Sequence, residues 1–152
     1  MRLKKCTILE MMQILGLDIG DKTVGVAKSD PLGYTAQPVT TIRYVQAPEA
    51  CKKLAQMIRE YAITKVIAGL PLNMNGTEGP QAKKVRAFVD GIEEAAKRMN
   101  LAVKFEFWDE RMSTMGAERS LIEADVSRVK RKQVIDKMAA VFILQGYLDS
   151  LK

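Results

Sequence analysis

The stretch ILGLDIGDKTVGVA, residues 14–27, decides the fold of this chain. Its first four residues form a short apolar run, which is typical of a buried central strand. Gly20 and Gly25 then flank a tight reversal of the chain, with Asp21 and Lys22 at its polar tip. Such reversals join antiparallel strands, so we predict a β-hairpin whose second strand covers residues 24–27.

Asp18 comes where the first strand is expected to end. A carboxylate at the end of a buried strand costs free energy unless a cation or a metal ion pairs with it. One interpretation is therefore a metal-binding aspartate displayed at the surface of the sheet. The other is an aspartate that opens the turn through a hydrogen bond from backbone to side chain. This stretch alone leaves both open.

The whole chain has the length and composition of one globular domain. Its 152 residues are 47% hydrophobic and 28% charged, with a net charge of +6 and a pI near 9.4. This positive surplus favours a polyanionic partner such as nucleic acid. Histidine is absent, which excludes histidine triads, histidine general bases and imidazole zinc sites. Cys6 and Cys51 lie outside any CxxC pattern, so we expect no disulfide framework and a cytoplasmic location.

Residues 1–13, MRLKKCTILEMMQ, are expected to form a flexible N-terminal extension ahead of a single domain that covers residues 14–152. The positive start resembles a signal peptide, but Glu10 and Gln13 interrupt the apolar run and no small-residue cleavage site follows. No stretch approaches the length of a membrane span, so no membrane partner is expected.

Strand and helix patterns alternate along the rest of the chain. Residues 34–43 read as a third strand, which Pro38 places at an edge of the sheet. Helices are expected at 48–61, from Pro80, from Ser113 or Thr114 to a break near 125–128, and from about Arg131 to the end; further strands are expected at 65–69 and 103–108. The terminal helix is predicted to bury Val134, Met138, Phe142, Leu148 and Leu151. This order predicts an α/β fold with a mixed sheet, antiparallel on one side and parallel on the other, and helices on both faces.

Acidic residues follow two of the predicted strands. Asp18 ends the first strand, and Asp109 and Glu110 follow the last. Ligands collect beyond the carboxyl ends of parallel strands, so these carboxylates are candidates for one site. Asp136 is a possible third member, because its helical face also carries Ala139, Ala140, Ile143 and Tyr147 and an unpaired acid on an apolar face is costly. The alternative is an acid that interacts favourably with the helix dipole.

Carboxylates without histidine or cysteine suit Mg²⁺ or Mn²⁺, and such ions suit phosphoryl chemistry. Basic residues lie beside the candidate acids in the sequence, where they could hold a phosphate backbone. The other interpretation is an ordinary solvated surface. The basic residues concerned are Lys22, Lys83, Lys84, Arg86, Arg111, Arg119, Arg128, Lys130, Arg131, Lys132 and Lys137.

The loop at residues 69–79 invites comparison with phosphate-binding loops, but it has neither GxxxxGK[ST] nor GxGxxG. Backbone amides at the start of the Pro80 helix could still hold a phosphate of a nucleic acid strand. Asn73, Asn75 and Thr77 could add side-chain hydrogen bonds. The alternative is a structural turn in which these residues only solve backbone geometry.

Four segments together resemble the YqgF family, whose members are described as Holliday junction resolvase-like proteins or pre-16S rRNA nucleases. They are ILGLDIGDKTVGVAKSD, GLPLNMNGTEGPQA, DERMSTMGAE and KQVIDKMAAVFILQGYLDS, and the resemblance covers nearly everything after Met12. It implies a ribonuclease H-like three-layer fold with a five-stranded sheet. It also implies that Asp18, Glu110 and Asp136 hold the metal, with Asp109 as a possible contributor. Lys22-Thr23 stands where many members have Lys-Arg, so one basic contact is missing.

The expected function is that of a Mg²⁺- or Mn²⁺-dependent endonuclease on structured nucleic acid, with the 5′ end of precursor 16S rRNA as its substrate. Cleavage of branched DNA at Holliday junctions is one alternative, and a catalytically silent nucleic-acid-binding assembly factor is another. The chain is expected to be a monomer or a weak homodimer. The expected nucleic-acid contacts are Lys22, Asn73, Asn75, Thr77, Arg111, Lys130, Arg131 and Lys132.

Overall fold

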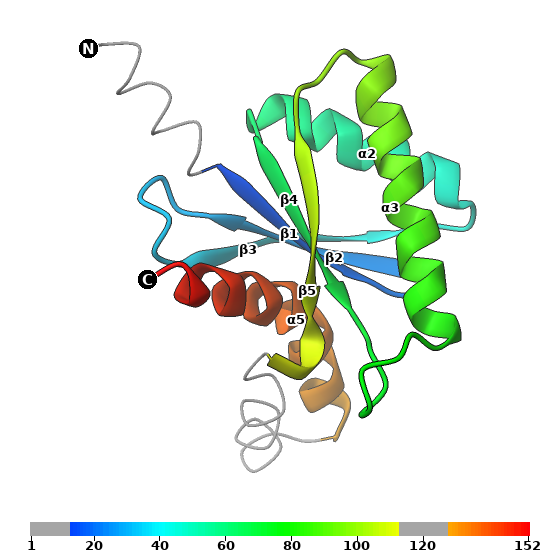
Figure 1. Cartoon of the computed structure of the whole chain (residues 1–152), viewed down its shortest axis with the longest axis vertical. Helices are drawn as coiled ribbons and strands as arrows, with labels where there is room; N and C mark the ends of the chain where they lie inside the picture. Colours follow the sequence, from blue (N-terminus) through cyan, green and yellow to red (C-terminus); the bar gives the residue numbers. More distant parts are fainter. Residues whose placement is uncertain (1–12, 113–127) are drawn as a thin grey trace.

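The computed structural model describes the backbone of residues 13–112 and 128–152 (Figure 1) and the side chains of 13–112 and 138–152. Most of the expected N-terminal extension and the helix expected from Ser113 or Thr114 lie outside the described residues. The elements are β1 (Ile14–Ile19), β2 (Thr23–Ser29), β3 (Ala36–Arg43), α2 (Ala47–Glu60), β4 (Lys65–Leu70), α3 (Pro80–Arg98), β5 (Lys104–Asp109), the short 3₁₀ helix η1 (Glu110–Met112) and α5 (Arg128–Ser150).

The five strands form one mixed sheet in the order β3-β2-β1-β4-β5. β1, β2 and β3 pair antiparallel, whereas β1, β4 and β5 pair parallel. The predicted hairpin and the mixed sheet are therefore confirmed. Pro38 lies in β3 at the edge of the sheet, as predicted, and the register between β2 and β3 shifts beside its partner Ala27.

Helices cover both faces of the sheet, with α2 and α3 on one face and α5 on the other (Figure 1). Alternation along β1 sends Leu15 and Leu17 into the core shared with α2 and α3. Ile14 packs in the second core, which α5 forms. A Cβ atom on Gly16 would lie only 2.6 Å from the Cβ of Leu144, so this glycine lets α5 approach the sheet closely. Residues 14, 16 and 18 of β1 therefore share the face that α5 covers.

The buried face of α5 differs from the predicted one. Leu148 is buried as predicted, but Leu151 is 61% exposed, and Met138 and Phe142 are only half-buried. The side chain of Val134 lies outside the described set. Apolar residues occupy most of the circumference of this helix, so their spacing does not select one face. The face of α5 that packs against the sheet is instead the one predicted to carry Asp136. Its buried residues are Ala139, Ala140, Ile143 and Leu144.

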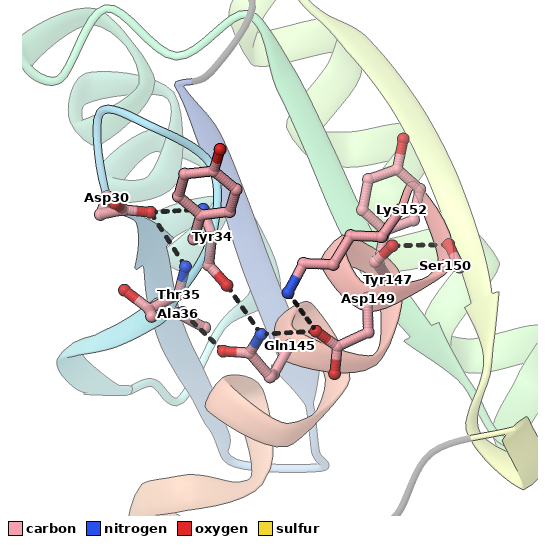
Figure 2. Close-up of polar contacts among 9 residues, drawn as sticks. All are labelled: Asp30, Tyr34, Thr35, Ala36, Gln145, Tyr147, Asp149, Ser150 and Lys152. Atoms are coloured by element: carbon pink, nitrogen blue, oxygen red, sulfur yellow. Dashed lines mark hydrogen bonds and ion pairs between the residues drawn. The ribbon is translucent and has the colours of Figure 1, made fainter.

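Gln145 ties the C-terminal half of α5 to one side of the sheet (Figure 2). Its Oε1 accepts a hydrogen bond from the Ala36 backbone N–H at 2.9 Å, and its Nε2 donates to the Tyr34 carbonyl at 2.9 Å. Nε2 also donates to Asp149 at 3.0 Å. The loop between β2 and β3, which Gln145 contacts, is closed by Asp30. Its carboxylate accepts hydrogen bonds from the Tyr34 and Thr35 backbone N–H groups.

Tyr147 ties the same part of α5 to the other side of the sheet. Lys65 at the start of β4 donates to the Tyr147 hydroxyl at 2.9 Å and lies 3.3 Å from the carboxylate of Glu106 in β5. The hydrogen bond to Tyr147 raises the pKa of Lys65, so the lysine stays charged. Gln145 and Tyr147 thus hold α5 on opposite sides, which fixes the rotation of the helix on the sheet.

A Gln145→Met variant is expected to lower the free energy of unfolding by about 1–3 kcal/mol, because the buried Ala36 N–H loses its acceptor. Urea denaturation measures this change. Lys152→Met is the matched control, since Lys152 also contacts Asp149, at 3.2 Å, but does not touch the loop backbone. An equal loss of stability in both variants would contradict the role given to Gln145.

Cys51 and the hydropathy of the helices are two further features of the described residues. Cys51 is buried between α2 and α3, and burial raises the pKa of its thiol to about 11, so it is not a thiolate nucleophile at neutral pH. Among the helices of the described residues, none is both long and apolar enough to cross a membrane.

Candidate active site

Asp18 lies near the carboxyl end of the central strand. β1 continues through Ile19, so Asp18 is its penultimate residue and pairs with Gly25 of β2. The strand, predicted to end at Asp18, is therefore one residue longer than expected. The turn that follows is closed by a backbone hydrogen bond from Gly20 to Thr23, at 2.8 Å. Asp18 is half-buried and lies on the face of the sheet that α5 covers.

Glu110 reaches the same place from β5. A Cβ atom on Gly69 would lie 2.6 Å from Glu110 Oε1 and 2.5 Å from Ile143 Cδ1 of α5. The Glu110 carboxylate therefore lies over Gly69, in space that any other residue would fill. Leu17 of β1 pairs with Ala68 of β4, and the next step of this parallel register sets Asp18 beside Gly69. Asp18 and Glu110 thus lie on either side of this glycine, at the carboxyl ends of the two strands that flank β4.

Asp109 and Glu110 have separate partners, although the sequence does not distinguish them. The Asp109 carboxylate accepts hydrogen bonds from Arg111 Nη2 at 2.7 Å and from the Arg111 backbone N–H at 2.9 Å. These bonds to Arg111 hold the pKa of Asp109 below its usual range. Asp109 is thus committed to Arg111, whereas Glu110 lies over Gly69.

Asp136 belongs to α5 by its backbone, but its side chain lies outside the described set. It precedes Ala140 by four residues and Ile143 by seven, which are spacings of one and two helical turns. The Ala140 carbonyl lies 3.3 Å from the Cβ position of Gly16, and Ile143 contacts Gly69. Among the side chains that the structure does describe, no three aspartate, glutamate or cysteine residues form a possible metal site.

The loop at residues 73–79 is held together by its own polar groups. Asn73 Nδ2 donates to Thr77 Oγ1 at 2.9 Å, and Thr77 Oγ1 donates to Asn75 Oδ1 at 2.6 Å. Gly76 has a φ of +87°, a conformation that favours glycine. Such contacts are expected of a structural turn, which was the alternative to a phosphate-binding loop in the sequence analysis. Arg111 Nη1 donates to the Met74 carbonyl at 3.1 Å, which joins the loop to η1 directly after Asp109.

The basic side chains near the carboxyl ends of β1, β4 and β5 differ in whether they are paired with an acidic residue. Lys22 is exposed in the β1–β2 turn, four residues after Asp18. Lys84 lies 3.6 Å from Asp21, and Arg86 lies 2.7 Å from Glu78, so these two belong to surface ion pairs. The side chains of Lys130, Arg131 and Lys132, in the first turns of α5, lie outside the described set.

Gly69 is the part of this site that sequence reasoning missed. The signal was present, because a lone glycine interrupts the apolar strand 65–70. Such a glycine often marks a close approach by another group. What the sequence does not reveal is which group approaches.

The mixed sheet and its covering helices define a ribonuclease H-like α/β protein. Among solved structures, Thermus thermophilus RuvC in complex with a Holliday junction substrate superposes with a TM-score of 0.59 over 93% of this chain and 97% of that one, at 11% identity. A second Thermus thermophilus RuvC structure gives a TM-score of 0.50, also at 11% identity. At this identity the likeness establishes the fold alone, and it confirms the predicted fold class.

The family follows from sequence comparison. The family model described as "RuvX: Holliday junction resolvase" matches residues 12–150, and the chain belongs to this family. A relative from Desulforamulus reducens is 55% identical over 139 residues, which cover 91% of this chain and 98% of the relative. One from Clostridium botulinum strain Hall is 51% identical over 140 residues, covering 92% and 98%. Both are named "Putative pre-16S rRNA nuclease", and the resemblance found in the sequence is confirmed.

Proposed function

We propose that this chain is a metal-dependent endonuclease that hydrolyses phosphodiester bonds in structured nucleic acid, with the 5′ end of precursor 16S rRNA as its substrate. The observation that carries the proposal is the convergence of Asp18 and Glu110 on Gly69, beneath the helix that contains Asp136. The family and the names of the relatives support the same reaction class.

The donor set fits a hard divalent cation. Asp18 and Glu110 offer only carboxylate oxygens, and Asp136 would add a third carboxylate, a set that suits Mg²⁺ or Mn²⁺. Once bound, such an ion supplies a Lewis acid that lowers the pKa of water and offsets negative charge on the phosphate. The protein contributes rigid placement, because β1 carries Asp18, η1 carries Glu110 directly after β5, and Gly69 leaves room for the Glu110 carboxylate.

The basic residues around the site would hold the phosphate backbone. Lys22 is exposed at the described edge of the sheet, Arg111 is partly exposed there although it also bonds to Asp109, and Lys130, Arg131 and Lys132 lie in the first turns of the helix that carries Asp136. Contacts of this kind give affinity that falls with salt and carry little base recognition. Asn73, Asn75 and Thr77 contribute by shaping the neighbouring loop, through the hydrogen bonds that they make with one another.

A cleavage assay of the unmodified protein with Mg²⁺ tests the proposal. A precursor 16S 5′ fragment is expected to be cut, and a fragment that begins at the mature 5′ end is the control. Preferential cleavage of a four-way DNA junction would support the second candidate, a junction resolvase, which the family description favours. Binding of both substrates without cleavage of either would contradict the endonuclease and support a silent assembly factor.

A further inference from the structure

The loop at residues 73–79 is built more rigidly than a simple connection needs. Backbone hydrogen bonds join Asn73 N–H to the Thr77 carbonyl at 2.8 Å and Gly76 N–H to the Asn73 carbonyl at 2.9 Å. Side-chain bonds among Asn73, Asn75 and Thr77 reinforce them. Few backbone or side-chain groups of the loop remain to rearrange when it meets a ligand.

The base of this loop is fastened to the protein on two sides. Glu78 accepts a hydrogen bond from Arg86 at 2.7 Å, and the Arg86 guanidinium lies 4.7 Å from the centre of the Phe107 ring. On the other side, Arg111 bonds to both Asp109 and the Met74 carbonyl. The loop is therefore fixed relative to β5 and η1, which carry Asp109 and Glu110.

This rigid loop holds an apolar side chain in water. Met74 is 94% exposed, and Met112, at the end of η1, is 68% exposed. A single exposed apolar residue is ordinary on a protein surface. Met74 differs because its backbone is clamped by Arg111, the residue that directly follows Glu110. The loop begins just after β4 ends at Leu70, next to Gly69, and it lies with η1 at the same end of the sheet (Figure 1).

We propose that Met74 is a wedge that packs against an unpaired or unstacked base of the nucleic acid bound at the candidate active site. The inference rests on the proposed function and narrows its substrate class to nucleic acid with a disrupted base stack near the cleaved bond. A flexible, polarisable thioether packs well against flat aromatic rings. Apolar side chains, methionine among them, insert between bases at kinked or unstacked steps.

Positively charged residues lie near the loop and complement the phosphates of a nucleic-acid strand. Exposed Lys83 and Lys84 follow it in the first turn of α3, and the partly exposed Arg111 lies beneath it. Lys83 and the exposed part of Arg111 can contact phosphates near the base that Met74 meets, whereas Lys84 pairs with Asp21 at 3.6 Å. A fully paired duplex offers the same phosphates but no open base face, so Met74 is expected to act only on disrupted substrates.

Two RNA hairpins test the wedge, one fully paired and one with a single bulged 2-aminopurine. Binding is measured by fluorescence in EDTA, which prevents metal-dependent cleavage. The unmodified protein is expected to bind the bulged hairpin more tightly and to change its fluorescence. Met74→Ser is expected to weaken binding of the bulged hairpin by about two- to tenfold, in line with the strength of a sulfur–aromatic contact, and to leave binding of the paired hairpin unchanged. Met74→Leu is expected to retain the preference.

Leu32→Ser is the matched control. Leu32 is also an exposed apolar loop residue, at 65%, but it lies between β2 and β3 at the other end of the sheet. Equal binding of both hairpins by the unmodified protein, or an equal loss on both hairpins in Met74→Ser, would overturn the wedge. If the unmodified protein binds both hairpins equally but still cleaves nucleic acid with Mg²⁺, only the wedge is refuted. If it prefers the bulged hairpin but does not cleave, only the endonuclease is refuted.

Discussion

An Asp18→Asn variant is expected to cut nucleic acid more than about 100-fold more slowly than the unmodified protein, while binding it with similar affinity. Loss of an outer-shell partner of a metal ligand already costs 10–100-fold, so loss of a ligand itself costs more. The substitution keeps the size of the side chain, so β1 and its pairing with β2 should persist. Single-turnover cleavage with Mg²⁺ and fluorescence anisotropy with the same substrate measure the two effects.

Asp21→Asn is the matched control for Asp18→Asn. Asp21 lies in the turn just after β1, is exposed and pairs at 3.6 Å with Lys84, so the same chemical change there removes one surface charge. Cleavage by Asp21→Asn is expected to stay near that of the unmodified protein. Equal rates for Asp18→Asn and Asp21→Asn would remove Asp18 from the chemistry.

The neighbouring pair Asp109 and Glu110 extends this test. Glu110→Gln is expected to lower cleavage as Asp18→Asn does, because its carboxylate lies over Gly69. Asp109→Asn is expected to keep most of the activity, because Asp109 is bonded to Arg111. The reverse ranking would assign the second catalytic carboxylate to Asp109.

A Gly69→Ala variant is expected to lose both stability and cleavage. The new methyl group would lie 2.6 Å from Glu110 Oε1 and 2.5 Å from Ile143 Cδ1, so the carboxylate and the end of the Ile143 side chain must both move. Overpacking of this kind costs about 1–3 kcal/mol in the free energy of unfolding. A displacement of a catalytic group by about 1 Å can cost about 100-fold in rate. Urea denaturation and single-turnover cleavage measure the two losses.

The double variant Gly69→Ala/Ile143→Val separates these two losses. Valine lacks the Cδ1 atom that the new methyl group would meet, so part of the stability should return. Ile143→Val alone is the control and is expected to cost about 0.5–1.5 kcal/mol with little effect on cleavage. Because the contact with Glu110 remains, the double variant should still cut slowly. Full recovery of cleavage in the double variant would show that α5 packing, not the carboxylate, was disturbed.

Local patterns in the sequence predict most of the sheet. Pro38 indicates an edge strand because proline cannot donate a ladder hydrogen bond, and β3 is at the edge. The reversal between Gly20 and Gly25 indicates the β1–β2 hairpin, which the structure contains. These features depend on a few neighbouring residues, so they can be predicted without knowledge of the tertiary contacts.

Features that depend on contacts between distant segments could not be predicted in this way. The choice between the faces of α5 is made by Gly16 and Gly69, which let Leu144 and Ile143 approach the sheet. The separation of Asp109 from Glu110 depends on Arg111 and on Gly69, a residue of another strand. The resemblance to a family indicated Glu110, but only the fold supplies the physical reason.

A structure of the protein soaked with Mn²⁺ shows whether the three carboxylates share an ion, because anomalous scattering locates this ion without ambiguity. We expect an anomalous peak within coordination distance of carboxylate oxygens of Asp18, Glu110 and Asp136. A fully soaked crystal in which these three side chains lie apart, with no peak among them or with the ion bound elsewhere, would contradict it.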